Sequence, residues 1–343
     1  EESEEYVETR VTNNIDLSGA VALSLTGADY SVTSNTMLLR NTQQDSVQNK
    51  GIMDEQRQFT VEKSYTWQER EFFMQQFIGE KLYPQFLDTQ INWGVTYSNA
   101  QLNSPDSRSY SLNVPGSDRD QAVNNEFDPL VNDRSDELEL LTTVRPQRDF
   151  LELEDEALDI QVAASMLLIS GDHYDFKLSA GLSSMERDRT VEADTFVYEL
   201  VGELSDNLAS EQDISNVLTP SLFDETSAGL TVKPDYNASY TGKWELTSFY
   251  MMPELNWFDV FKVQAGVRME ESTLTVTTLP NPDTNESSKV EVSDDNVYPS
   301  ANLTVTAIED VQLRLSYYES VNRPDFREIS SSQFKDSVTG DSY

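Results

Sequence analysis

The sequence predicts an all-β fold, an antiparallel up-and-down transmembrane β-barrel of which this chain supplies about ten strands. Three observations predict it. Apolar and polar residues alternate with period two along most of the chain, short and long connections alternate between the expected strands, and the strands are long enough to cross a tilted bilayer. We expect residues 1–343 to be part of a single barrel domain.

The alternation is cleanest where Val263 and Val267 are interleaved with Gln264 and Arg268. Successive side chains of a strand point to opposite faces, so such a segment separates an apolar from a polar environment. The same pattern recurs in residues 91–98, 176–183 and 311–317. Because soluble sandwiches alternate in the same way, this pattern alone does not distinguish lipid from a protein core.

The connections are more informative than the alternation. The expected strands pair as 16–26 with 30–42, 60–82 with 88–102, 156–169 with 175–190, 238–252 with 260–277, and 297–307 with 311–322. Short turns join the members of each pair, at 27–29, 83–87, 170–174, 254–259 and 308–310. Long acidic segments separate the pairs, among them 104–150, 192–236 and 279–296. Outer-membrane barrels keep short turns at the periplasmic rim and long loops outside, so we expect two distinct rims.

Strand length and aromatic placement agree with a bilayer. A tilted transmembrane strand needs about 9–11 residues, and most expected strands reach that length. Aromatic residues gather beside the short turns, as at the interface of a membrane barrel. If the barrel prediction is right, six apolar side chains should face lipid and be exposed, namely Ile91, Val95, Val263, Val267, Leu313 and Leu315.

Composition excludes several functions. With 61 acidic and 24 basic residues, the formal net charge is -37, which disfavours nucleic acid as a partner. There is no cysteine, and His173 is the only histidine and falls in an expected turn. Neither a catalytic triad nor a zinc site can be built from these residues, so we expect no enzyme. No run of apolar residues is long enough for a transmembrane helix.

Three motifs near the end of the sequence carry a family resemblance. They are Tyr298–Leu303 (YPSANL), Val311–Tyr317 (VQLRLSY) and Val321–Glu328 (VNRPDFRE), in that order. Weaker matches lie at 68–80, 97–108 and 264–270. This order of motifs resembles the middle of the β-barrel of TonB-dependent outer-membrane receptors.

The resemblance implies a function. Such receptors take up a scarce ligand, such as a ferric chelate or an oligosaccharide, across the bacterial outer membrane, with outer-membrane lipid and the TonB energy-coupling complex as partners. Their barrels are larger and hold a plug domain, so the resemblance implies that plug and closing strands are absent from this chain. Two alternatives stay open, a passive pore or structural barrel, and a soluble acidic all-β binding module.

Candidate ligand-binding residues follow from the expected faces and loops. Polar residues that alternate inward should line the lumen, and we single out Arg268, Glu270, Arg314 and Arg323. In the expected outer loop 192–236, aromatic contact with a small-molecule or oligomeric ligand would come from Phe196, Tyr198 and Phe223.

No cofactor is expected, apart from a possible calcium ion in an acidic loop. Asp283 and Glu286, with neighbouring asparagines, offer the hard oxygen ligands that calcium takes from flexible acidic segments. No EF-hand pattern accompanies them. These two residues are the candidate metal ligands.

Overall fold

The computed structural model describes residues 5–52, 59–113, 139–140, 147–199, 229–232, 239–279, 287–308 and 311–330. In these ranges twelve strands form one antiparallel sheet. The ten long strands are β1 (Glu5–Thr26), β2 (Tyr30–Ile52), β3 (Phe59–Tyr83), β4 (Thr89–Asn113), β6 (Gln147–Gly171), β7 (Tyr174–Glu199), β9 (Tyr240–Trp257), β10 (Phe261–Thr278), β11 (Lys289–Ile308) and β12 (Val311–Tyr318). Two short strands, β5 (Glu139–Leu140) and β8 (Gly229–Val232), pair with β4 and β7.

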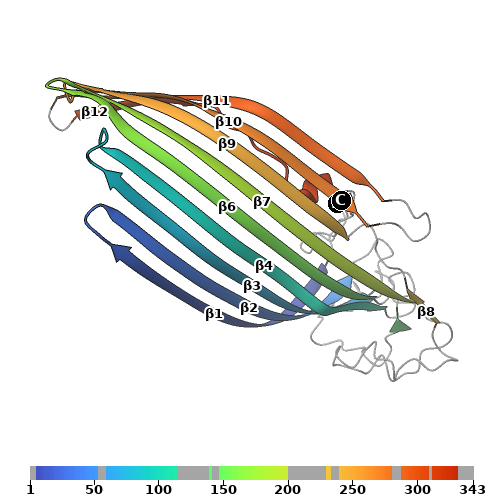
Figure 1. Cartoon of the computed structure of the whole chain (residues 1–343). Helices are drawn as coiled ribbons and strands as arrows, with labels where there is room; N and C mark the ends of the chain where they lie inside the picture. The colour runs from blue at the N-terminus through green and yellow to red at the C-terminus, as the bar shows by residue number, and fades with distance from the viewer. Residues whose placement is uncertain are drawn as a thin grey trace.

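The order of the long strands in the sheet is their order in the sequence. Every pair of neighbours is antiparallel, so the sheet is a continuous meander, and it curves like the wall of a barrel (Figure 1). This confirms the predicted fold class and the predicted hairpin order. Among the described residues, no helix is long and apolar enough to cross a membrane.

Four of the five short turns, and the paired ends of β11 and β12 at Ile308 and Val311, lie at one rim, as predicted. Backbone hydrogen bonds join each turn to the next hairpin: Leu82 donates to Asp29, Leu167 to Leu87, Phe258 to His173 and Thr306 to Val260. The other ends of the paired strands therefore lie at the opposite rim. The prediction that His173 lies in a turn is also confirmed, and its ring stacks on that of Phe258 at 4.6 Å.

The strands are longer than the sequence pattern predicts. Residues 104–113, 147–150, 192–199 and 289–296 were expected in acidic connections and instead extend β4, β6, β7 and β11. Backbone pairing continues there because it does not depend on side-chain polarity, whereas the apolar alternation ends where the strands leave the bilayer. By contrast, β12 is shorter than predicted, because it ends at Tyr318 and not at residue 322.

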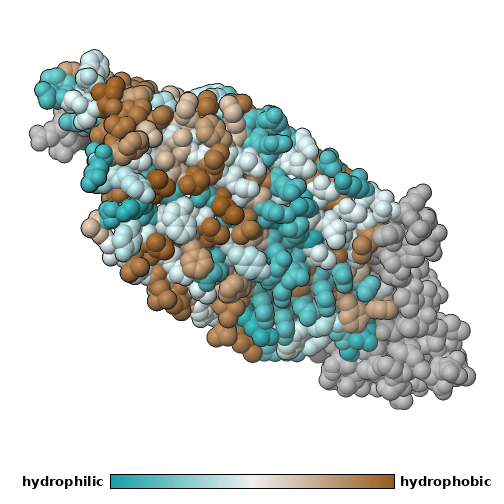
Figure 2. Space-filling model, in the orientation of Figure 1, coloured by the Kyte–Doolittle hydropathy of each residue, from teal (hydrophilic) through white to brown (hydrophobic). Residues whose placement is uncertain are grey.

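One face of the sheet is apolar near the turns. The side chains that define it include Leu182, Ile160 and Val263, with exposed fractions of 55%, 47% and 42%. Leu313 and Leu315 are exposed as predicted, and Ile91, Val95 and Val267 are half-buried; none of the six is buried. Figure 2 shows hydrophobic side chains gathered over the part of the strands near the turns and hydrophilic ones further along. This is the lipid-facing surface of a membrane barrel.

The opposite face, which we call the inner face, is polar. Asn35, Gln76 and Thr96 form a hydrogen-bonded row across β2, β3 and β4 on it. Residues 319–330 follow β12 and fold back over this face; we call them the returning segment. It ends in the single-turn helix α3 (Phe326–Ile329), whose Phe326 side chain is 1% exposed.

Candidate functional site on the inner face

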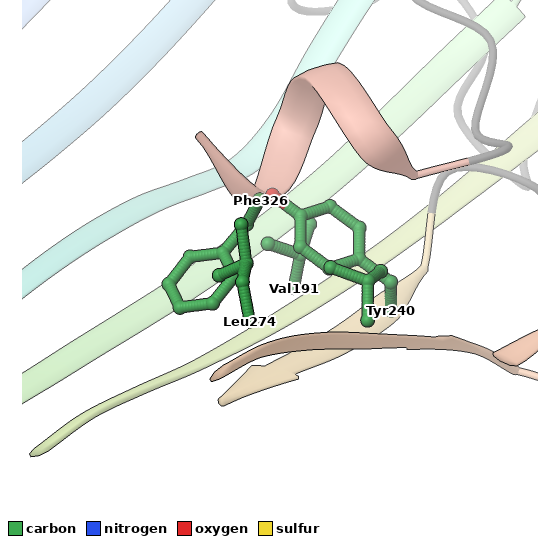
Figure 3. Packing of buried hydrophobic residues seen from close by; sticks show 5 residues of the cluster. Val191, Tyr240, Leu274 and Phe326 are labelled. Atoms are coloured by element: carbon green, nitrogen blue, oxygen red, sulfur yellow. The ribbon is translucent and has the colours of Figure 1, made fainter. Parts of the chain in front are cut away.

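The returning segment is held on the inner face by an apolar contact. Phe326 points from α3 into a cluster formed with Val191 of β7, Tyr240 of β9 and Leu274 of β10 (Figure 3). Gly242 makes the close approach possible, because a Cβ atom there would lie 2.5 Å from the Phe326 ring. This cluster is one of the few places in the described sheet where apolar residues are fully buried.

Two arginines of β7 flank the same ring. The guanidinium carbons of Arg187 and Arg189 lie 5.3 Å and 5.2 Å from the Phe326 ring centroid, within the range of cation–π interactions. Residues 187 and 189 share a face because strand side chains alternate. The Phe326 ring therefore contacts two guanidinium groups of β7 in addition to the apolar side chains of its cluster.

Carboxylates on both sides neutralise these arginines. Asp155 of β6 accepts two hydrogen bonds of 2.8 Å from Arg187 and another from Arg189. From the returning segment, Asp325 accepts a bond of 2.9 Å from Arg189 and lies 3.9 Å from Arg187. The Asp155 side chain is only 11% exposed, so its two ion pairs are shielded from solvent, whereas the Asp325 side chain is 47% exposed and its ion pairs are accessible to solvent.

A second ion-pair cluster surrounds Arg323. This residue donates two hydrogen bonds to Asp294 of β11, at 2.7 and 2.9 Å, and one of 2.8 Å to Glu270 of β10. Glu270 also accepts a hydrogen bond from Arg268. The hydrogen bonds with Asp294 raise the pKa of the Arg323 guanidinium above its usual value, so this cation does not titrate. The two clusters fasten the returning segment at points two residues apart.

A hollow of about 340 Å³, lined by both polar and apolar side chains, adjoins this second cluster. Several strands line it with uncharged hydrogen-bonding side chains, among them Asn92, Gln161, Ser183 and Tyr250. Arg268 belongs to both places, because it lines the hollow and pairs with Glu270. The hollow is therefore linked to the returning segment through a chain of ion pairs.

Of the residues selected from the sequence, the structure brings three together. Arg268, Glu270 and Arg323 form one cluster on the inner face. Arg314 lies apart, exposed on β12. Phe196 lies in β7 rather than in a loop, because the strand continues past the apolar pattern, and its ring meets Phe150 edge to face at 5.5 Å.

The other selected residues cannot be placed on this face. Tyr198 belongs to β7, but its side chain lies outside the described part of the chain, as do Phe223, Asp283 and Glu286. Within the described part, no three acidic or histidine side chains are arranged to hold a metal ion. The calcium prediction therefore remains a prediction.

Three residues of the site, Arg187, Arg189 and Asp155, are not among those selected from the sequence. A signal was present, because Arg187 and Arg189 stand two apart in an acidic chain and so put two cations on one face of a strand. Their partner Asp155 is 32 residues away from Arg187, and only the strand register brings them together.

Curvature, a lipid-facing belt, a polar inner face and turns gathered at one rim define this chain as part of a bacterial outer-membrane β-barrel. Residues 210–339 match the model of the family described as outer membrane protein beta-barrel family. No curated protein matches the chain in sequence.

Solved structures that are similar to this chain include three receptors. The match to the siderophore receptor PiuA from Acinetobacter baumannii covers 93% of this chain and 49% of PiuA, at 11% identity and a TM-score of 0.45. The match to the ferric-catecholate import receptor Fiu from E. coli K12, in its open form, covers 92% of this chain and 54% of Fiu, at 9% identity and a TM-score of 0.46. The match to BauA, the ferric preacinetobactin receptor from Acinetobacter baumannii, covers 100% of this chain and 50% of BauA, at 10% identity and a TM-score of 0.40. The chain spans about half the length of these receptors.

Proposed function

We propose that this chain forms part of the wall of an outer-membrane receptor that takes up a scarce ligand with energy from the TonB complex. The observation that carries the proposal is the inner face, which is polar and ion-paired and lies below the rim with the long connections. An aqueous path lined by such a face suits a hydrophilic ligand in transit. The motif resemblance supplies the energy-coupling part of the proposal.

A ferric chelate is the first ligand class to examine, and an oligosaccharide is the second. Two kinds of observation favour a chelate: the names of the receptors of similar fold, and arginines on the inner face that can pair with anionic groups. The role is transport, with no chemical step assigned to any residue. TonB and outer-membrane lipid are the proposed partners.

Uptake of radioactive iron tests this function. Cells that lack the gene and cells that express the full-length protein are compared, each with and without an intact tonB gene, on ferric catecholate, ferric hydroxamate and ferric citrate. We expect receptor-dependent uptake of at least one chelate, and we expect it to stop without TonB. Uptake that persists without TonB would indicate the passive pore. Failure with every chelate, followed by TonB-dependent uptake of a labelled oligosaccharide, would replace the ligand class and keep the mechanism.

A further inference from the structure

The two anchors of the returning segment have opposite charge. One anchor is Asp325, which sits between Arg187 and Arg189, and the other is Arg323, which sits between Glu270 and Asp294. Only Pro324 separates them in sequence. Each anchor therefore meets a wall site of the opposite sign.

The wall sites keep a charge when the segment is taken away. Next to Phe326, Arg187 and Arg189 face Asp155 alone, which leaves one uncompensated positive charge. At the other site, Arg268 pairs with Glu270, and Asp294 is left with a hydrogen bond from the uncharged Asn296 and an uncompensated negative charge. The returning segment neutralises both at once, and an ionic ligand group can do the same at either site.

We propose that the returning segment is a latch on the inner face, and that an anionic ligand group releases it by taking the place of Asp325 on Arg187 and Arg189. Two arginines converging on one point suit a multivalent anion such as a carboxylate- or phosphate-bearing group. Release removes Phe326 from its cluster and uncovers the wall next to the hollow.

The geometry favours release over a permanent fixture. Apart from the single turn of α3, residues 319–330 form no regular secondary structure, and the segment is held by side chains rather than by a strand ladder. Phe326 and the partly buried Ile329, both on α3, are its apolar contacts, and the fastening at Arg323 and Asp325 is electrostatic. Interactions of this kind respond to a competing ion, whereas a hydrogen-bonded strand pair does not.

This inference deepens the proposed function, because it assigns a ligand chemistry and a moving part to the same wall. It does not need transport for its test. Trypsin cuts after arginine but not before proline, so within the latch it cuts only at Arg327 and spares Arg323, which precedes Pro324. The rate of the Arg327 cut reports the open population of the latch.

The first experiment removes each anchor in the full-length protein in outer-membrane vesicles. Asp325→Asn keeps a side chain that can begin α3 but loses the charge, and Arg323→Gln removes the other anchor. We expect each variant to be cut at Arg327 about tenfold faster than the wild type, since a lost charged hydrogen bond costs about 1.5 kcal/mol or more. Arg314→Gln is the control, because it removes an exposed arginine of β12 and leaves the latch intact; its rate should match the wild type. Equal rates in all four proteins would overturn the latch.

The second experiment supplies an anion. Sodium pyrophosphate is compared with sodium chloride at equal ionic strength, and the cut is normalised to that of an added peptide. We expect pyrophosphate to accelerate the Arg327 cut in the wild type several-fold beyond chloride, and to have no such extra effect in Asp325→Asn. If chloride acts equally, screening alone explains release and the anion site is overturned. If uptake fails but these rates hold, the proposed function falls and the latch remains.

Discussion

Alanine in place of Gly242 tests whether the Phe326 contact holds the returning segment. A Cβ atom at this position would lie 2.5 Å from Cδ1 of Phe326, whereas ordinary contacts begin at about 3.4 Å. The ring must therefore retreat by about 0.9 Å, which is the difference between those two distances. Neither Arg187, Arg189 nor any other ion-pair residue is altered, so the change acts on the apolar anchor alone.

The size of the effect is bounded from two sides. Overpacking of a tight contact costs about 1–3 kcal/mol. If the Phe326 ring instead leaves its cluster while the ion pairs hold, the docked state loses no more than the burial of one phenylalanine, about 1.5–3 kcal/mol. The undocked population should thus rise about 5- to 150-fold, at tenfold for each 1.4 kcal/mol.

Hydrogen exchange measures that population directly. The amide of Ser330 donates to the carbonyl of Phe326 at 3.0 Å and is protected only while α3 is formed. Gly19→Ala is the matched control, because its Cβ atom meets no atom within 4 Å and its backbone change in a strand is the same. Exchange at Ser330 within twofold of the wild type in Gly242→Ala, or equal acceleration in Gly19→Ala, would refute the argument.

Four further substitutions test the two faces and the second anchor. Leu178→Arg, on the lipid-facing side of β7, should destabilise the barrel by about 2–4 kcal/mol, while Ser179→Arg on the inner face should cost less than about 1 kcal/mol; urea titration in vesicles compares them. Tyr97→Phe removes the hydroxyl that donates to Glu156 at 2.7 Å, and the same titration should show a loss of about 0.5–1.5 kcal/mol. Tyr298→Phe should leave the Arg327 cleavage rate unchanged, because the hydroxyl lies 3.4 Å from its arginine partner and such a contact is weak; a tenfold increase would contradict this.

The sequence predicted the sheet well because one physical rule controls it. Val263 and Gln264 point to opposite faces of the strand, because strand side chains alternate with period two. One face meets the bilayer and the other meets water, so the sequence alternates between apolar and polar residues. Beyond the bilayer both faces meet water, so the alternation ends while backbone pairing continues. The sequence pattern therefore predicts connections at residues 104–113 and 192–199, although these residues extend β4 and β7.

The site was predicted only in part, for a different reason. Period two places Arg268 and Glu270 on the inner face, and the family motif draws attention to Arg323. Their meeting depends on a chain reversal after β12, and Arg323 is 53 residues away from Glu270 in sequence. No local pattern encodes that reversal. The burial of Phe326 was equally hidden, because an isolated aromatic in a polar segment has no period to indicate its partner.

The alternating charge of the two anchors also fixes how the returning segment sits. If the segment were reversed over the wall, Arg323 would meet Arg187 and Arg189, and Asp325 would meet Glu270. Both contacts would then be repulsive, and each would leave a wall site uncompensated in a partly buried place, which is costly. One arrangement is therefore favoured by attraction at both ends and its reverse is disfavoured at both ends. A charge reversal at one anchor should consequently loosen the segment more than neutralisation does, and the rate of the Arg327 cut in Asp325→Lys compared with Asp325→Asn measures that difference.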